Sequence, residues 1–366
     1  MRIGFHNPFR GAVGGGERYL YTMLEEATGR GGAELLVLAP ERPDVARWAR
    51  VGVRVAPEAF GWRPTEARGL TEASRDLDLL VTLATDVPVA SGARRSVAVV
   101  QFPFRARERL GERARAAVLG AVGRRRAPAA LATYSRFLCY SDFSRRWIER
   151  RLGVEAEVLP PPVDPPGAPP AASRRPWIVS VGRFFRGAHE KRQDVLIEAF
   201  GELAAEGWEL HLAGGADPGA GDWIEELRAR AAGLPVAFHV DAERSEVLDL
   251  YARAALFWHA AGYGVDARRH PERLEHFGIA TAEAMAHGAV PLVVPEGGQA
   301  EIVRDGETGR HWRTIPDLVA RTGELIGAPE RAAALRRSAA EAARRYDTAR
   351  FRRAVRDRIL PLAEEP

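Results

Sequence analysis

The chain has 366 residues, of which 46% are hydrophobic and 28% are charged, and its formal net charge at neutral pH is +4. This length exceeds that of one ordinary domain, and the apolar content is sufficient for two hydrophobic cores. The one cysteine, Cys139, excludes an internal disulfide framework. A strand pattern begins at Arg2, and no apolar stretch approaches the length of a membrane span. We therefore expect a soluble, cytoplasmic protein.

Residues 1–165 predict a first α/β domain, because strand-like and helix-like patterns alternate along them. A helical pattern starts near Tyr19. The predicted strands cover residues 2–5, 35–38, 77–83, 97–100 and 132–139.

A glycine-rich loop follows the first strand and includes Gly11, Gly14, Gly15 and Gly16. Such loops let backbone amides approach a phosphate or a sugar closely. The run G-A-V-G-G-G lacks the G-x-G-x-x-G spacing of dinucleotide-binding proteins, so a purely structural turn stays open as an alternative.

Arginines are interleaved with apolar residues over 105–126, which predicts a basic amphipathic helix. Such a helix can lie on an anionic membrane surface, so peripheral membrane association is one interpretation. A solvated helix face is the alternative. Nucleic acid is disfavoured as a partner, because no recognised binding module accompanies the arginines.

A proline-rich segment, 160–176, separates the first domain from a second α/β pattern. The fold class predicted is α/β, with two doubly wound, Rossmann-like domains facing a cleft. We place the first domain at 1–165, the second at 166–345, and a final helix at 346–366 that packs back towards the first domain. The predicted strands of the second domain are 177–181, 209–212, 236–240, 256–259 and 290–294, and its predicted helices are 194–205, 223–232, 245–254, 279–287, 317–326 and 330–345.

The cationic residues of this chain are all arginine except Lys191. Lys191 and Arg183 flank a loop that joins the strand at 177–181 to the following helix. Ligands of open α/β sheets bind at the carboxyl ends of the strands, where helix N-termini attract anions. Two cations at this edge therefore predict a phosphate or diphosphate ligand.

The segment 273–303 carries two glutamates, Glu275 and Glu283, eight residues apart around the start of a helix. Gly278 permits a ligand to approach the backbone N–H groups of Phe277, Gly278 and Ile279. A carboxylate at the mouth of the site can accept hydrogen bonds from sugar hydroxyls, and a deeper one can hold a ribose diol.

With these motifs the chain resembles the family 4 glycosyltransferases of the GT-B fold, which transfer sugars from nucleotide donors with retention of configuration. The resemblance covers nearly the whole chain and rests on GGGER at 14–18, on Arg183 and Lys191, on the E-x7-E of Glu275 and Glu283, and on EGGQAEIV at 296–303. WHAAGYG at 258–264 and EHFGI at 275–279 are most similar to the lipid-linked-oligosaccharide mannosyltransferase branch and its bacterial relatives.

The resemblance implies a role for each matching residue. Arg183 and Lys191 would neutralise the leaving diphosphate, Glu283 would hold the ribose and Glu275 the donor sugar. Gly15 and Gly16 would face the cleft from the first domain. The partners implied are a GDP- or UDP-linked hexose donor of mannose or glucose type and a glycan or lipid-linked acceptor.

The acceptor side departs from the family pattern. Related enzymes often have a His-aromatic-Pro sequence at the end of a first-domain strand, whereas this chain has Gln101 before Phe102 and Pro103. Glutamine cannot exchange protons as imidazole does. His6, at the end of the first strand, is the alternative residue for this position, and a structural histidine is equally compatible with the sequence.

We predict no metal and no cofactor besides the nucleotide-sugar. Asp76 and Asp78 form a D-x-D that leads directly into a strand, and His259, His270, His276 and His287 lack a metal-ligand spacing. Arginine and lysine can supply the charge that Mg²⁺ supplies elsewhere. Two alternatives remain: a dinucleotide- or adenosyl-cofactor enzyme that uses the N-terminal glycine loop, and a non-catalytic nucleotide-binding protein at the membrane.

Overall fold

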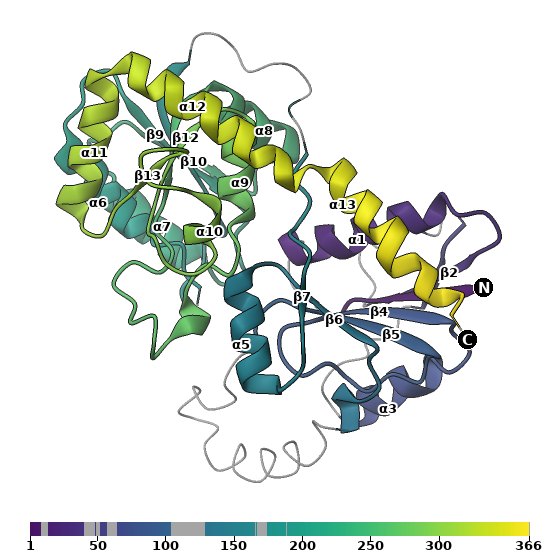
Figure 1. Cartoon of the computed structure of the whole chain (residues 1–366). Coiled ribbons are helices and arrows are strands. Elements are labelled where there is room, and N and C mark those ends of the chain that lie inside the picture. The colour runs from purple at the N-terminus through teal and green to yellow at the C-terminus, as the bar shows by residue number, and fades with distance from the viewer. Residues whose placement is uncertain are drawn as a thin grey trace. The chain divides into compact units, whose positions relative to one another are not determined.

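The chain forms two compact units, and it passes between them twice (Figure 1). The first unit comprises Met1–Pro162 with Ala349–Pro366, and the second comprises Val163–Thr348. None of the described helices is long and apolar enough to cross a membrane. The computed structural model describes residues 1–8, 14–39, 48, 52–56, 64–103, 129–164, 166, 174–187 and 189–365.

A parallel sheet forms the centre of the first unit. Its described strands pair in the order β3-β2-β1-β4-β5-β6-β7, which is a doubly wound order. The predicted strands are present, although the last is shorter than predicted. The edge strands β3 and β7 were not predicted, because two or three residues are too few to show a pattern. The strands are β1 (Arg2–His6), β2 (Glu34–Leu38), β3 (Arg54–Ala56), β4 (Leu79–Ala84), β5 (Arg95–Val100), β6 (Arg136–Cys139) and β7 (Glu157–Val158).

Helix α1 (Gly15–Thr28) begins four residues earlier than the sequence predicted. Gly14 adopts an extended conformation at the N-cap, and its N–H donates to the Glu17 carboxylate at 3.0 Å. This capping box satisfies a backbone donor of the first turn. Gly15 and Gly16 therefore lie in the helix and not in the preceding loop. Gly11 lies outside the described residues.

The first unit also contains the α-helices α3 (Pro64–Ala73) and α5 (Asp142–Leu152), and α13 (Thr348–Ala354) from its second residue onward. Sequence patterns did not predict α3 and α5. The arginines of α5 mask its short apolar stripe, yet the N-cap hydroxyl of Ser141 accepts from the Ser144 N–H, and Gly153 ends the helix in the left-handed region.

The C-terminal segment completes the first unit. Phe351 in α13 meets the buried Tyr19 of α1 edge to face, with 4.7 Å between ring centroids. Arg356 forms an ion pair of 2.7 Å with Glu26 of the same helix α1. These contacts hold residues 349–365 against residues that are more than 300 positions earlier in the sequence.

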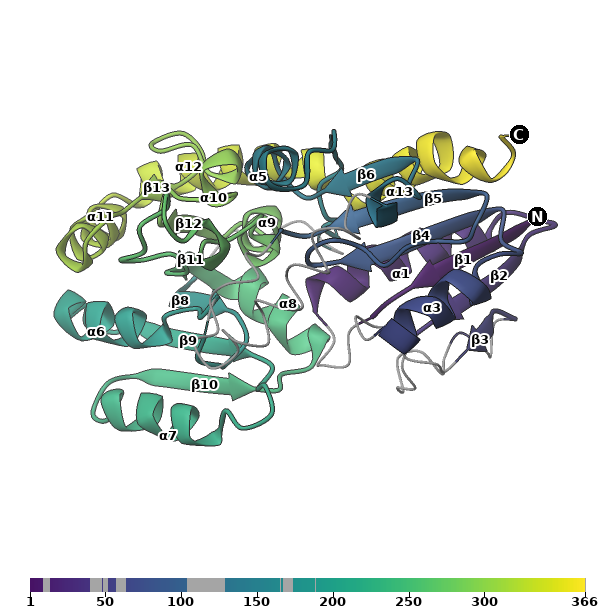
Figure 2. The same cartoon turned by 90° about the horizontal axis from the view of Figure 1, so that it is seen from below.

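The second unit also has a doubly wound parallel sheet, with its described strands in the order β10-β9-β8-β11-β12-β13 (Figure 2). The predicted strands are present, whereas β13 was not predicted. The strands are β8 (Arg175–Val181), β9 (Glu209–Gly214), β10 (Val236–Val240), β11 (Ala254–His259), β12 (Val290–Val293) and β13 (Arg310–His311). The helices are α6 (Gln193–Leu203), α7 (Gly221–Arg230), α8 (Arg244–Arg253), α9 (Ile279–Ala286), α10 (Gln299–Ile302), α11 (Ile315–Gly327) and α12 (Pro329–Ala343).

Apolar residues cover both faces of this second sheet. Ile178 of β8 packs with residues of α6 and α7, whereas its neighbour Val179 packs with residues of α8 and α9. Successive side chains of a strand point to opposite faces, so a sheet that is covered on both sides requires a continuous apolar run. The run WIVSV meets this requirement.

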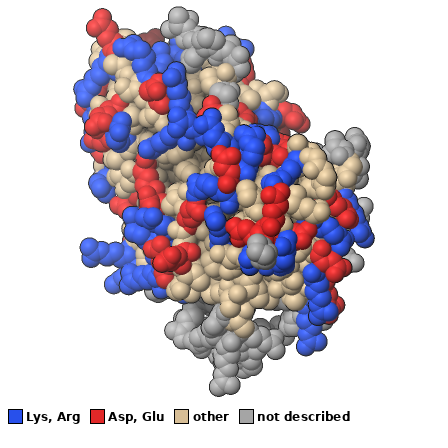
Figure 3. Space-filling view, turned by 45° about the vertical axis from the view of Figure 1, so that its right-hand side comes forward, with Lys and Arg blue, Asp and Glu red and all other residues tan. Residues whose placement is uncertain are grey.

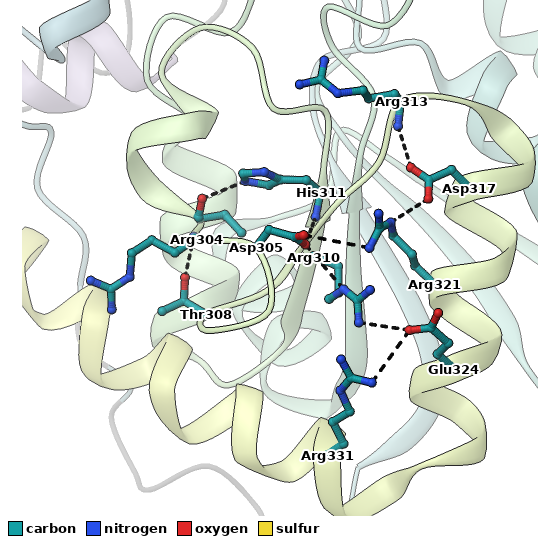
Figure 4. A network of polar contacts seen from close by, with 11 residues as sticks. Arg304, Asp305, Thr308, Arg310, His311, Arg313, Asp317, Arg321, Glu324 and Arg331 are labelled. Carbon is teal, nitrogen blue, oxygen red and sulfur yellow. Dashed lines mark hydrogen bonds and ion pairs between the residues drawn. The ribbon is translucent and has the colours of Figure 1, made fainter.

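Strand β13 is held by charge and not by an apolar pattern (Figure 4). The buried Arg310 forms ion pairs with Asp305 at 3.4 Å and with Glu324 at 3.0 Å. Asp305 also accepts a hydrogen bond of 2.8 Å from the His311 N–H. Burial alone would raise the pKa of Asp305, but this hydrogen bond and the nearby arginines lower it.

Asp76 and Asp78 directly precede β4, as the sequence predicted. Asp78 accepts a hydrogen bond of 2.7 Å from the Arg2 backbone N–H and pairs with Arg94 at 2.9 Å. Asp76 is 3.7 Å from the Arg2 guanidinium. Both carboxylates therefore bind protein groups at the amino end of the sheet, opposite the edge where ligands of such folds bind.

Candidate functional site

The reversal of strand order in the second sheet lies between β8 and β11. The crevice of a doubly wound sheet opens at the carboxyl ends of these strands. Gly182 follows β8, and His259 is the last residue of β11. Lys191 packs against Gly182 so closely that a Cβ at position 182 would lie 2.6 Å from its Cγ. Glycine at 182 therefore makes room for the lysine stem at the crevice.

Lys191 and Glu275 form a short ion pair at this edge. The Nζ atom of Lys191 donates to Oε2 of Glu275 at 2.6 Å, and Nε2 of His259 lies 3.1 Å from the same oxygen. The side chains of Lys191 and Glu275 are 22% and 17% exposed, so the pair is largely shielded from water but accessible to a ligand. The structure thus joins a lysine, a glutamate and a histidine from three separate segments.

The electrostatics of this triad favour an ionised carboxylate. Burial alone would raise the pKa of Glu275, but the charge of Lys191 and the hydrogen bond from His259 hold it well below its usual range. Burial also lowers the pKa of His259, which keeps its ring neutral at pH 7. His259 therefore donates through Nε2–H. Its Nδ1 is buried without a hydrogen-bond partner among the described residues.

Two more histidines lie beside the triad. The rings of His189 and His276 meet edge to face, with 4.5 Å between their centroids. Burial and the charge of Lys191 lower the pKa of His189 to about 4, and burial together with His189 lowers that of His276. Both rings are neutral at pH 7, so the charges of this cluster come from Lys191 and Glu275.

Glycines bring the segment 296–299 onto the start of α9. Gly278, the N-cap of α9, has φ of 108°, and a Cβ there would lie 2.7 Å from the amide nitrogen of Gln299. A Cβ at Gly297 would lie 2.3 Å from the Glu275 carbonyl oxygen. No side chain caps the N-terminus of α9 in the described part of the chain, so its first N–H groups remain available to an anion.

Phe277 and Ile279 flank this N-cap and have different surroundings. Phe277 is buried and meets the ring of Tyr346 edge to face at 5.1 Å. Ile279 is the first residue of α9 and is half-buried. Their backbone amides, and not their side chains, are the groups that the sequence assigned to the ligand.

Glu283 lies further along α9 and has a different partner. Its carboxylate is 5% exposed and binds the Arg244 guanidinium through both oxygens, at 2.6 and 3.0 Å. The two glutamates of the E-x7-E are therefore each paired with one cation. Arg183 has a separate partner among the described residues. It pairs with Asp217 at 3.0 Å and lies over the Phe185 ring.

In the first unit, the structure brings together Gln101, which the sequence assigned to the acceptor side, and Gly16, which it assigned to nucleotide-sugar binding. A Cβ at Gly16 would lie 2.2 Å from Nε2 of Gln101, so this glycine makes room for the Gln101 side chain. Gly15, the first residue of α1, is half-buried. His6 is 1% exposed and its Nδ1 lies 2.6 Å from the Thr82 hydroxyl, which is the environment of a structural histidine.

The model of the family described as glycosyl transferases group 1 matches residues 167–342. The match spans just under half of the chain. The match covers the triad, both glutamates of the E-x7-E and the two cations Arg183 and Lys191.

Two curated relatives resemble parts of the chain. The GDP-mannose-dependent alpha-(1-6)-phosphatidylinositol monomannoside mannosyltransferase of Mycolicibacterium smegmatis is 32% identical over 170 residues, which are 44% of this chain and 41% of the relative. The lipopolysaccharide core biosynthesis mannosyltransferase LpsB of Rhizobium meliloti is 29% identical over 201 residues, 50% of this chain and 51% of the relative. The chain thus spans about half or less of the relatives it matches.

Solved structures resemble the whole chain in fold. A glycosyltransferase from Rickettsia africae has a TM-score of 0.73 at 14% identity and covers 99% of this chain and 98% of its own. HepE of Anabaena, solved with UDP and glucose, has a TM-score of 0.72 at 17% identity and covers 98% of each chain. The two parallel-sheet units of this chain are those of the GT-B fold.

Several residues of the site were not predicted from the sequence. His259 and His276 were considered only as metal ligands, and His189 and Arg244 were not considered. A signal for His259 was present, because polar residues at the carboxyl end of a buried strand lie in the crevice of a doubly wound sheet. No sequence signal marked Arg244 as the partner of Glu283, since 39 residues separate them.

Proposed function

We propose that the chain is a retaining, metal-independent glycosyltransferase that moves a hexose of mannose or glucose type from a nucleotide-diphosphate-sugar to a glycan or lipid-linked acceptor. The observation that carries the proposal is the ion pair of Lys191 and Glu275, held by His259 at the strand-order reversal of a group 1 family domain. The names of the two mannosyltransferase relatives support a mannose donor.

Each group has a chemical role in this reaction. The bond from the anomeric carbon to the diphosphate breaks, and a bond to the acceptor oxygen forms on the same face of the sugar. Lys191, Arg183 and the N-terminal amides of α9 stabilise the negative charge that develops on the leaving diphosphate. A phosphate oxygen takes the proton of the acceptor hydroxyl.

Glu275 and His259 act on the donor sugar. The ionised carboxylate of Glu275 accepts hydrogen bonds from sugar hydroxyls and stabilises positive charge near the anomeric carbon. Neutral His259 orients this carboxylate through its Nε2–H. When the diphosphate binds, Lys191 is shared between the phosphate and Glu275, so the resting ion pair keeps both groups in place before the donor arrives.

We assign Gln101 to the acceptor side, and Gly15 and Gly16 to binding of the nucleotide-sugar from the first unit. His6 is not assigned, because it is buried against Thr82. A cofactor enzyme that uses the N-terminal glycine loop is not favoured, because Gly15 and Gly16 belong to helix α1 and the family match lies in the second unit.

A thermal-shift screen of nucleotide-sugars tests the proposal, since a ligand that binds the folded state raises its melting temperature. We expect GDP-mannose or UDP-glucose to raise the melting temperature in the presence of EDTA, and the same sugars as free monosaccharides to leave it unchanged. A screen in which no nucleotide-sugar has an effect would count against the proposal.

Replacing Glu283 with alanine should chiefly raise the KM for the donor. If Glu283 holds the ribose, it binds a part of the donor that does not react, so its loss weakens ground state and transition state equally. We expect KM to rise by about tenfold with little change in kcat. Steady-state kinetics with varied donor concentration measure both constants, and an unchanged KM would remove this assignment.

The predicted basic helix at 105–126 lies outside the described residues, and we propose that it places the enzyme on anionic membranes. If so, the protein should co-sediment with vesicles that contain phosphatidylglycerol and should dissociate as salt rises. Figure 3 shows that Lys and Arg lie beside Asp and Glu on one face of the described surface. Absence of binding at low salt would favour a soluble acceptor.

A further inference from the structure

Arg244 stands between the ribose-binding candidate Glu283 and the segment where the chain enters the second unit. Arg244 is the first residue of α8, and Glu283 lies on the neighbouring helix α9 (Figure 1). Its guanidinium binds Glu283 through two nitrogen atoms, at 2.6 and 3.0 Å, and lies 3.8 Å from Asp164. Burial alone would lower the pKa of Arg244, but the hydrogen bonds to Glu283 raise it, so the guanidinium is charged.

The contact through two nitrogen atoms determines how the Glu283 carboxylate can meet a diol. An ionised carboxylate has about four lone-pair sites, and a bidentate arginine uses two of them. Because the guanidinium is planar, the contact fixes the plane of the Glu283 carboxylate and the direction of the lone pairs that do not point to Arg244. A vicinal diol has two hydroxyl groups that match two such sites.

Arg244 is itself anchored at a fixed part of the second unit. The chain enters this unit at Val163 and leaves it after Thr348, and these two segments are hydrogen-bonded to each other. The Val163 N–H donates to the Tyr346 carbonyl at 2.8 Å, and the Thr348 N–H donates to the Val163 carbonyl at 3.0 Å. The Thr348 hydroxyl donates to Asp164 at 2.9 Å, which orients that carboxylate beside Arg244.

A second arginine holds the same two helices together. Arg174 donates to the carbonyl of Tyr251 near the end of α8, at 3.0 Å, and to the carbonyl of His287 at the end of α9, at 2.6 Å. The helices that carry Arg244 and Glu283 are therefore tied at their C-terminal ends independently of the Arg244–Glu283 pair. Loss of the pair should alter the carboxylate rather than the packing of the helices.

We propose that Arg244 is a positioning residue for the donor, which fixes the Glu283 carboxylate so that it accepts the two hydroxyl groups of the nucleotide ribose. This inference rests on the proposed function and adds a residue to its donor site. Without Arg244, Glu283 would still be a carboxylate but would lack a defined orientation. Its ability to recognise a diol, and not the binding of the phosphates, would be lost.

A binding experiment with altered ribose separates these effects. We would measure the affinity of the wild type, Arg244→Gln and Arg253→Gln for GDP and UDP, for their 2′,3′-dideoxy forms, and for pyrophosphate. Arg253 is the matched control, because it lies on the same helix and forms an exposed ion pair of 2.8 Å with Asp249. We would also measure Arg244→Lys, which keeps the positive charge but lacks the planar guanidinium. The melting temperature of every variant would show whether it is folded.

For the nucleotide that the wild type binds, Arg244→Gln should weaken binding about tenfold, while pyrophosphate binding stays within about twofold of the wild type. Removing the ribose hydroxyls should lower the affinity of the wild type and of Arg253→Gln for the nucleotide by about tenfold. It should lower the affinity of Arg244→Gln by at most about twofold. Arg244→Lys should have an intermediate affinity for the nucleotide and an intermediate loss on removal of the ribose hydroxyls. It replaces Arg244→Gln in the comparison if Arg244→Gln does not fold.

Equal ribose discrimination in Arg244→Gln and the wild type would overturn the inference while leaving the proposed function intact. Equal loss of nucleotide and pyrophosphate binding in Arg244→Gln would also overturn it, because that result indicates a general structural role. If the wild type binds neither GDP nor UDP, the proposed function fails and this inference fails with it.

Discussion

Replacement of Lys191 by alanine should lower turnover by about two to three powers of ten, by analogy with the loss of one electrostatic donor to a developing negative charge. Lys191 is the lysine of a chain whose other cations are arginine, and its amino group lies at the carboxyl edge of the sheet, 2.6 Å from Glu275. The measurement is kcat for release of nucleoside diphosphate from the donor. The substitution also leaves Glu275 without its cation, so donor binding should weaken as well.

Lys191→Arg should also have a lower kcat. The aliphatic part of Lys191 packs tightly on Gly182, and a planar guanidinium would bind Glu275 through two nitrogen atoms. Arg186→Ala is the matched control. Arg186 belongs to the same loop but pairs with Glu226 and lies over Trp223. Arg186→Ala should keep wild-type turnover. Full activity in both Lys191 variants would mean that the lone lysine has no part in the reaction.

Replacement of Glu275 should affect kcat far more than donor binding. Its carboxylate is ionised and faces the region proposed for the donor sugar, where positive charge develops only in the transition state. Glu275→Ala should lower kcat by about a hundredfold or more. Free nucleoside diphosphate should bind the variant about as well as the wild type, since Lys191 is then available to the phosphate.

Glu275→Gln refines this test, because glutamine keeps the size of the side chain and the hydrogen bond to His259 but not the charge. Its kcat should resemble that of Glu275→Ala if charge is the decisive property. Wild-type kcat in Glu275→Ala would remove the catalytic assignment. Lost nucleotide binding would instead place Glu275 among the residues that hold the nucleotide.

The fold was largely predictable from the sequence, because apolar runs and helical spacing are local properties of the chain. The central strands of both sheets are long enough to show such patterns. The short edge strand β13 is not, since Arg310 is held there by ion pairs with Asp305 and Glu324. Helix α5 was missed because arginines outnumber its buried residues, and the start of α1 depends on a capping contact between Gly14 and Glu17.

The candidate site was predictable residue by residue but not as an arrangement. Lys191, Glu275 and Glu283 were each singled out by composition, spacing and resemblance. That Lys191 pairs with Glu275 while Glu283 pairs with Arg244 depends on which strands are neighbours in the sheet. Such partners come from segments tens of residues apart, and no local pattern specifies them.

The most direct test of the central claim is the release of nucleoside diphosphate from GDP-mannose and UDP-glucose in the presence of EDTA, with acceptor omitted. A retaining glycosyltransferase that uses Lys191 and Arg183 in place of a metal should hydrolyse one of these donors slowly, and Lys191→Ala should reduce that rate to the background. Equal release by wild type and Lys191→Ala, or no release from either donor by the wild type, would contradict the account.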